Sequence, residues 1–236
     1  FTNLSDVTAT YTITAAKHTS ELSSGTKVYD GKKVSETFKP TLKLKDSTGK
    51  VVDTITLTKD QYIFDTKTPD SANVGKYTIK LSDSEIKAIK AKYPNYSFDN
   101  LDSISTTFTI TAASVATKLS GGSKVYDGKT VGESGWTPTL TLTPNNGDNA
   151  IEIPLEKGQF VIDNDNSKVG HYTINLSTDE IKAIKAKYPN YDLSSLDNVS
   201  SIYLITAQSV KATLTSGNKV YDGKPINYTP ILTFGT

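Results

Sequence analysis

The hexapeptide Lys27-Val28-Tyr29-Asp30-Gly31-Lys32 decides how this chain is organised, because it returns twice at nearly equal intervals. The copies are Lys124-Val125-Tyr126-Asp127-Gly128-Lys129 and Lys219-Val220-Tyr221-Asp222-Gly223-Lys224, so the motif recurs about every 95 residues. Asp-Gly is a turn signal, because glycine adopts positive φ without steric cost. We therefore interpret the Tyr-Asp-Gly triplets as a structural motif, with the tyrosine buried beside a turn; the alternative is a ligand contact. The residues are Tyr29, Asp30, Gly31, Tyr126, Asp127 and Gly128.

Two further matches set the limits of the repeat. The segment from Glu85 to Tyr96 is identical to the segment from Glu180 to Tyr191. The ending Phe-Thr-Ile-Thr-Ala at 108–112 resembles residues 11–15 and 203–207. We predict the last strand of a preceding repeat at 1–16, repeat 1 at 17–113, repeat 2 at 114–208 and the start of a truncated third repeat at 209–236. The chain is then expected to be a section of a longer array.

Each repeat has the pattern of a small β domain with one helix. Short alternating apolar runs separated by turn residues indicate strands. The pairs Ser82/Glu85 and Ser177/Glu180 have the spacing of a helix capping box, and a proline ends each helix. We predict a mainly β protein of tandem antiparallel β-sandwiches of immunoglobulin-like character, each with one short helix before its last strand. A β-grasp-like α+β arrangement is the alternative.

Composition and charge argue against several classes of function. The 26 basic and 25 acidic residues nearly cancel, which disfavours general nucleic-acid binding. No apolar run is long enough to span a bilayer. Cysteine is absent, which excludes thiolate catalysis, and the two histidines, His18 and His171, do not occupy equivalent positions. We expect a monomeric protein without catalytic residues, metal or cofactor.

Two groups of residues are candidates for ligand binding. Trp136 stands two residues before a proline, in an Aro-X-Pro motif that Phe38 and Tyr228 begin in the other copies. An exposed aromatic ring at this position could stack on a sugar. The alternative is that these rings cover an end of the sandwich. The second group is a set of helix lysines that could meet acidic glycans, or could simply form a solvated face. These lysines are Lys87, Lys90, Lys92, Lys182, Lys185 and Lys187.

One loop has the composition of a possible calcium site. The run Asp163-Asn164-Asp165-Asn166 is rich in oxygen ligands, but it lacks the spacing of an EF-hand. Asx-turns in a surface loop account for the same residues.

The order of these motifs resembles the MBG/YDG-type repeats of Gram-positive, lactobacillus-type cell-surface adhesins. The resemblance rests on Lys-Val-Tyr-Asp-Gly-Lys, then Val-Gly-X-Tyr-Thr-Ile, then Asn-Tyr and a closing Phe/Tyr-X-Ile-Thr strand. It implies an extracellular protein, anchored to the cell wall or secreted, whose repeats adhere to host mucin, glycan or matrix protein, or form a stalk. Neighbouring repeats of the same chain are the other expected partners. An accessory module of a secreted polysaccharide-acting enzyme is the alternative role.

Overall fold

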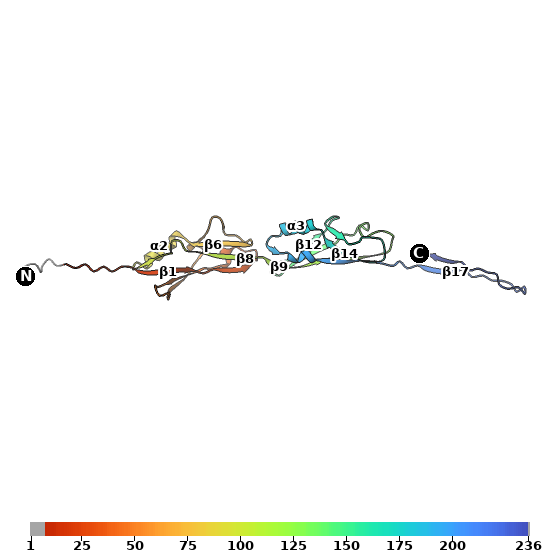
Figure 1. The fold of residues 1–236 in the computed structure, drawn as a ribbon, viewed down its shortest axis with the longest axis horizontal. Coiled ribbons are helices and arrows are strands. Elements are labelled where there is room, and N and C mark those ends of the chain that lie inside the picture. The colour runs from red at the N-terminus through yellow and green to blue at the C-terminus, as the bar shows by residue number, and fades with distance from the viewer. Residues whose placement is uncertain (1–7, 236) are drawn as a thin grey trace, which may run out of the picture. The chain divides into compact units, whose positions relative to one another are not determined.

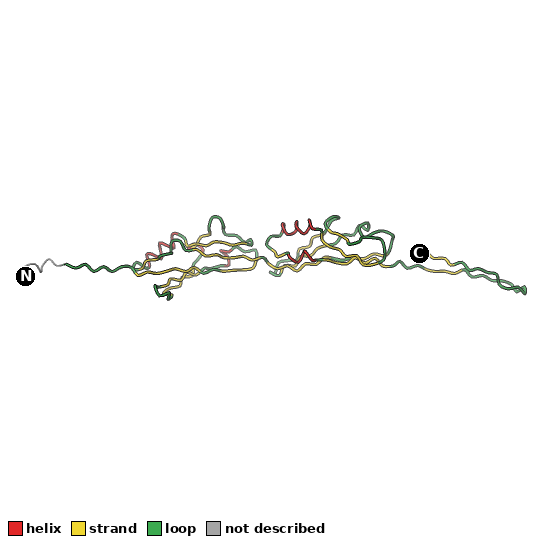
Figure 2. The backbone as a smooth tube through the Cα atoms, viewed as in Figure 1, coloured by secondary structure: helices red, strands yellow, loops and turns green. Residues whose placement is uncertain are grey.

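The computed structural model describes residues 8–235 of the chain. Its contacts divide the chain into two compact units, the first built mainly on repeat 1 and the second mainly on repeat 2. Both are mainly β, as the sequence pattern predicts (Figures 1 and 2).

Repeat 1 consists of two four-stranded sheets that enclose one core. The first sheet has the order β4-β3-β1-β7 and the second has the order β2-β8-β6-β5. The strands of the first sheet are β1 (Ala16–Leu22), β3 (Thr41–Lys45), β4 (Val51–Thr56) and β7 (Tyr96–Phe98). Those of the second are β2 (Gly25–Val28), β5 (Tyr62–Phe64), β6 (Gly75–Leu81) and β8 (Ser105–Thr111).

The core of repeat 1 lies between these sheets because alternate side chains of each strand point inward. Leu42 and Leu44 of β3 face Ile79 of β6 and Ile110 of β8 within one buried cluster. Leu42 and Ile79 are both 0% exposed. Three short helical segments complete the repeat: α1 (Val34–Thr37), η1 (Lys59–Gln61) and α2 (Asp83–Lys92).

Helix α2 packs on the sandwich through Ile89, which is 2% exposed, while Ile86 and Tyr93 lie partly buried beside the core. The Ser82 hydroxyl accepts the backbone N–H of Glu85 at 3.3 Å, as a capping residue should. The Glu85 carboxylate accepts the amide N–H of Gln61 at 2.7 Å. The helix start is therefore tied to η1 on the neighbouring segment of the chain.

Repeat 2 has the same order of strands. Its sheets are β12-β11-β9-β15 and β10-β16-β14-β13, and its long helix is α3 (Thr178–Lys187). The 3₁₀ segment η2 (Ser194–Asn198) follows the helix. The strands are β9 (Ala113–Leu119), β10 (Gly122–Val125), β11 (Thr139–Pro144), β12 (Ile151–Pro154), β13 (Phe160–Ile162), β14 (Gly170–Leu176), β15 (Tyr191–Asp192) and β16 (Ser200–Thr206).

The sheets are mixed, although the hairpin pattern predicted antiparallel pairing. Strand β2 runs parallel to β8, and β1 runs parallel to β7; β10 with β16 and β15 with β9 repeat this arrangement. The parallel pairs bring the first strands of each repeat beside its last strands. They close the repeat by contacts between its two ends, which a local pattern in the sequence does not reveal.

The flanking segments differ from the two repeats. Residues 8–15, which we expected to form a closing strand, have no strand in the described part of the chain, and Tyr11 is 91% exposed. A strand needs a hydrogen-bonded neighbour, and none pairs with these residues. Residues 1–7 of that prediction lie outside the described residues. At the other end, β17 (Lys211–Leu214) pairs antiparallel with β18 (Leu232–Gly235).

Within residues 8–235, no helix has the length and apolar character needed to cross a membrane.

Candidate functional site: the Lys–Asp turn and the Trp136 groove

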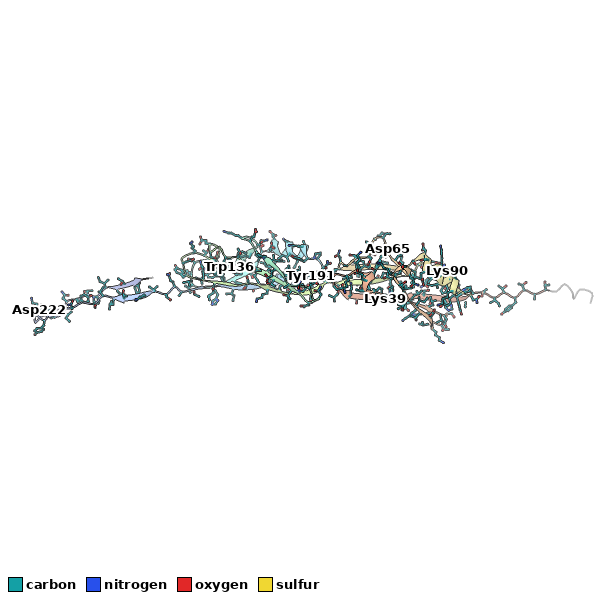
Figure 3. The ribbon with its side chains drawn as sticks, turned by 180° about the vertical axis from the view of Figure 1, so that it is seen from behind. Lys39, Asp65, Lys90, Trp136, Tyr191 and Asp222 are labelled. Atoms are coloured by element: carbon teal, nitrogen blue, oxygen red, sulfur yellow. The ribbon has the colours of Figure 1, made fainter. Side chains whose placement is uncertain are left out.

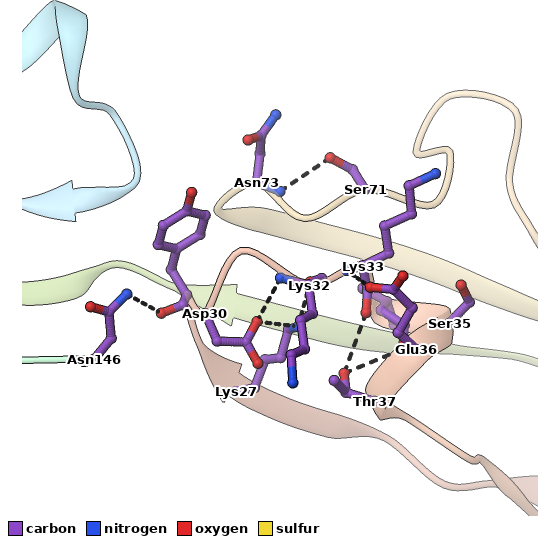
Figure 4. A network of polar contacts seen from close by, with 12 residues as sticks. Lys27, Asp30, Lys32, Lys33, Ser35, Glu36, Thr37, Ser71, Asn73 and Asn146 are labelled. Atoms are coloured by element: carbon purple, nitrogen blue, oxygen red, sulfur yellow. Dashed lines mark hydrogen bonds and ion pairs between the residues drawn. The ribbon is translucent and has the colours of Figure 1, made fainter. Parts of the chain in front are cut away.

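The Tyr-Asp-Gly motif forms a turn held by the lysine that begins the hexapeptide. Lys27 Nζ donates to Asp30 Oδ1 at 2.7 Å and to the carbonyl oxygen of Lys32 at 2.5 Å, and the Lys32 N–H donates to Asp30 Oδ1 at 3.0 Å (Figure 4). Gly31 has φ +73°, a conformation that residues with a Cβ rarely adopt. We call this arrangement the Lys–Asp turn.

Repeat 2 reproduces the Lys–Asp turn with nearly the same distances. Lys124 Nζ lies 2.8 Å from Asp127 Oδ1 and 2.6 Å from the carbonyl oxygen of Lys129, and Gly128 has φ +77°. The hydrogen bond from Lys124 and the N–H of Lys129 hold the pKa of Asp127 below its usual value. Burial alone would raise the pKa of Asp30, but hydrogen bonds from Lys27 and Lys32 lower it overall. Aspartate and glycine therefore have structural roles in this motif.

The tyrosine of the motif is less buried than predicted. Tyr29 is half-buried beside the core of repeat 1, whereas Tyr126 is 42% exposed and Tyr221 is 93% exposed. The prediction of a buried tyrosine is therefore wrong for Tyr126. The tyrosine directly follows the short strand β2 or β10, so its burial depends on what lies beside the end of that strand rather than on the turn itself.

The aromatic residue of the Aro-X-Pro motif packs over a glycine in each repeat. Phe38 lies against Phe108 with ring centroids 4.6 Å apart, and a Cβ on Gly25 would lie 2.8 Å from the Phe38 ring. In repeat 2, Trp136 lies 4.7 Å from Tyr203, and a Cβ on Gly122 would lie 2.7 Å from the indole Nε1. Part of each aromatic ring therefore covers the sandwich, as the structural interpretation predicted.

In repeat 2 the same tryptophan also lines an open groove. The Trp136 groove has a volume of about 570 Å³ and lies beside the start of β11 and along β13 (Trp136 is labelled in Figure 3). The half-buried rings of Trp136 and Phe160 lie 6.2 Å apart at 75°. The residues that matter for its chemistry are Gly132, Gly135, Trp136, Lys157, Phe160 and Asp165.

The polar groups of the groove are two side chains of opposite charge. The Asp165 carboxylate accepts the backbone N–H groups of Val131 at 2.9 Å and Gly132 at 3.1 Å, so both oxygens already have donors. Lys157 is exposed and belongs to none of the ion pairs formed by residues 8–235. The groove thus combines two aromatic rings with one solvent-exposed cation.

Phe160, Lys157 and Gly135 were not among the residues selected from the sequence. A comparison of the two copies could have pointed to these residues, because the copies differ in sequence here. Repeat 2 has one residue more before its aromatic, Val131-Gly132-Glu133-Ser134-Gly135-Trp136 against Val34-Ser35-Glu36-Thr37-Phe38, and Lys157-Gly158 where repeat 1 has Lys59-Asp60.

The lysine-rich helices offer a less basic surface than their sequence indicates. Lys90 lies 2.7 Å from Asp102 (Lys90 is labelled in Figure 3). The equivalent residue of repeat 2, Lys185, lies 2.8 Å from Asp197, so the same ion pair forms within each repeat. Lys92 pairs with Asp53 and Lys182 with Asp179. Exposed pairs contribute only about 0–1 kcal/mol each to stability, but they reduce the net charge of the helix surface. Lys87 and Lys187 are the other two lysines of this set, and both are exposed.

The oxygen-rich loop forms hydrogen bonds within repeat 2. Asn166 Oδ1 accepts from the Lys168 N–H at 2.9 Å and from the Tyr172 hydroxyl at 2.7 Å. Asp165 receives the two N–H groups named above, and Asn164 has φ +52°, as is tolerated by asparagine. Asx-type bonding therefore accounts for these side chains. No group of three or more potential metal ligands occurs among residues 8–235.

Together these features define a tandem-repeat β protein whose modules each contain a Lys–Asp turn. The chain belongs to the MBG domain family, whose pattern matches residues 16–112 and 113–207. MBG domains are repeat modules found in surface proteins. Comparisons with curated proteins and with solved structures gave no match.

Proposed function

We propose that this chain is an adhesive region of a Gram-positive surface protein, extracellular and either anchored to the cell wall or secreted. Its repeats would attach the cell to carbohydrate on host mucin or on other host surfaces. Membership of a family found in surface proteins supports the location, and the repeat structure supports multivalent attachment.

The observation that carries this proposal is a shared scaffold with one divergent surface. Both repeats keep the Lys–Asp turn and the glycine beneath the aromatic ring. At the aromatic, however, repeat 2 has an open groove lined by Trp136 and Phe160. An aromatic ring beside a polar group suits a sugar, because one face of a sugar is apolar and its edge carries hydroxyl groups. The ion pairs on the helices favour this groove over the lysines as the main binding surface.

Attachment of this kind is expected to be weak for one chain and strong for an array. Linked modules raise apparent affinity by about 10²–10⁴ when several can bind at once. The test is binding of the 236-residue chain to immobilised mucin and to a panel of glycans and matrix proteins, as a monomer and as a tandem duplicate. Binding that rises with copy number supports adhesion. If neither form binds any surface of the panel, the adhesion proposal is wrong and a stalk role is favoured.

The same panel separates adhesion from the accessory role in a polysaccharide-acting enzyme. A module of such an enzyme should bind the bacterial polysaccharide and leave mucin unbound.

A further inference from the structure

The Trp136 groove has the size and lining of a site for a small ligand. Ligand sites usually enclose about 300–1,000 Å³ and combine apolar walls with a few polar groups. The Trp136 groove falls in this range at about 570 Å³. Trp136 is fixed from one side, because it packs on Gly122 and Tyr203, so its position does not depend on a bound ligand.

Repeat 1 fills the equivalent position with its own side chains. Tyr62 is 4% exposed and donates its hydroxyl to the carbonyl oxygen of Phe38 at 3.3 Å. Phe160, its counterpart, has no hydroxyl and is half-buried on the wall of the groove. The loss of one hydroxyl thus coincides with the opening of the aromatic wall.

The backbone around the aromatic also differs between the repeats. In repeat 1, helix α1 precedes Phe38, and Ser35 donates its hydroxyl to Asp70 at 2.5 Å. In repeat 2 the helix is replaced by a turn that contains Gly132 and the extra residue Gly135, which has φ +75°. Glycine disfavours a helix, and a Cβ at Gly132 would lie 2.8 Å from the Asp165 carboxylate that this turn binds. The loop of residues 163–169 in repeat 2 is also shorter than the loop of residues 65–74 in repeat 1.

The charges of the groove select the kind of ligand. Asp165 is already hydrogen-bonded by two backbone N–H groups, whereas Lys157 is exposed and outside the ion pairs of residues 8–235. Repeat 1 has Asp60 directly after Lys59, and repeat 2 has Gly158 after Lys157. Glu156 precedes Lys157 but is not part of the lining of the groove. Lys157 is therefore the one cation of the lining, and its ammonium group is open to an anionic group of a ligand, whereas the Asp165 carboxylate is held by backbone N–H groups.

We propose that the Trp136 groove of repeat 2 binds an acidic saccharide, with a sugar ring stacked on Trp136 and its acidic group beside Lys157. This inference rests on the proposed adhesive function and adds the ligand class, the repeat and the residues. Repeat 1 has Phe38, the buried Tyr62 and Asp60 in place of Trp136, Phe160 and Gly158, and it serves as an internal control.

The experiment is a titration of the 236-residue chain with a uronic-acid disaccharide and with its neutral methyl ester. Trp136 is the only tryptophan, so its fluorescence reports on this groove directly, and calorimetry follows variants that lack it. We expect the acid to bind up to about fivefold more tightly than the ester, which corresponds to the upper value of about 1 kcal/mol for one exposed pair of charges. The preference should shrink above about 0.15 M salt, where the Debye length is about 8 Å.

Matched variants distinguish the contribution of the Trp136 ring from that of the Lys157 charge. Trp136→Ala should weaken binding of both ligands about tenfold, the loss expected for removing an aromatic contact of about 1.4 kcal/mol. Lys157→Gln should weaken only the acid and make its affinity equal to that of the ester. Phe38→Ala and Lys59→Gln in repeat 1 should change neither. Trp136→Phe retains an aromatic ring and covers the case in which Trp136→Ala does not fold.

The outcomes distinguish this inference from the adhesion proposal. Equal binding by Lys157→Gln and the unchanged chain, or a loss with Lys59→Gln instead, overturns the assignment of the groove. If the chain binds mucin but not the disaccharide, adhesion stands and the groove is not its site. If the disaccharide binds but no host surface does, the groove stands and adhesion fails.

Discussion

Repeat 1 and repeat 2 differ least where the backbone needs a particular residue and most where a side chain faces solvent. The Lys–Asp turn has nearly the same distances in both repeats: the lysine lies 2.7 Å from the aspartate in repeat 1 and 2.8 Å from it in repeat 2. The contact between the helix glutamate and a preceding glutamine is 2.7 Å in both, Gln61–Glu85 and Gln159–Glu180. Around Phe38 and Trp136, by contrast, the two repeats differ in chain length, helix content and burial.

This difference separates the scaffold of the repeat from its variable surface. A turn with positive φ and a glycine beneath an aromatic ring tolerate few substitutions, because a Cβ would strain the backbone or overlap the ring. A change such as Tyr62 to Phe160 removes one hydrogen bond and retains the fold. The surface at the aromatic can therefore change between repeats while the core stays the same.

The largest expected effect tests whether each repeat has its own core. Leu140, like its counterpart Leu42, is 0% exposed. Leu140→Ala should lower the free energy of unfolding by about 2–5 kcal/mol, because it removes buried methyl groups and leaves a cavity. Denaturant unfolding followed by Trp136 fluorescence measures this change in repeat 2. Leu42→Ala is the control and should shift the circular dichroism transition with little effect on the fluorescence. Equal shifts of the fluorescence midpoint in both variants would mean that the repeats unfold together.

An intermediate effect tests the glycines beneath the aromatic rings. A Cβ at Gly122 would lie 2.6 Å from the Tyr203 ring, and a Cβ at Gly25 would lie 2.7 Å from the Phe108 ring. Gly122→Ala and Gly25→Ala should each destabilise the chain by about 1–3 kcal/mol, the usual cost of overpacking. Only Gly122→Ala should also shift the Trp136 emission. Gly235→Ala is the matched control, because Gly235, like Gly25 and Gly122, does not have positive φ and nothing lies within 4 Å of the added Cβ. A stability of Gly25→Ala equal to that of the unchanged chain would contradict the packing described here.

The smallest effect concerns pH and the Lys–Asp turn. The pKa of Asp127 is lowered in the folded protein, so its contribution to stability is present above the pKa of the unfolded chain, about 3.9. That contribution is lost as pH falls through the folded pKa, because protonation of Asp127 breaks its ion pair with Lys124. Asp127→Asn should therefore lower the unfolding midpoint at pH 7 and reduce the difference between pH 7 and pH 3. Fluorescence-monitored unfolding at both pH values measures it, with Asp163→Asn as a control outside the turn. An unchanged difference between the two pH values would show that the turn does not depend on its charge.

Local patterns were sufficient to predict the long helix of each repeat and the Asp-Gly turns, but not the short segments α1, η1 and η2. Helix α2 begins directly after Ser82, as the capping spacing indicates, because the serine hydroxyl can satisfy an N–H that has no partner within the helix. The glutamate at the third position of the helix was expected to bond back to the cap. It instead binds Gln61, which lies 24 residues earlier in the chain, and a pattern of four residues cannot show such a partner.

The pairing of the strands and the candidate site were only partly predictable. Trp136 could be selected because an aromatic before proline recurs in all three copies. Its neighbours Phe160 and Lys157 come from a later strand and turn, and their approach depends on how the second sheet packs. The parallel pairing of β10 with β16 depends likewise on contacts more than 75 residues apart in sequence.

By itself, the sequence determined the repeat, its length, the Asp-Gly turn and the mainly β class, because each depends on residues close together in the chain. Glycine at positive φ, a capping serine and alternating apolar residues act over a few bonds, and they act in the same way in every copy. The tertiary structure alone decided which tyrosine is covered and which aromatic lines a groove. Those outcomes depend on burial, and burial is set by segments that meet only when both sheets have closed around the core.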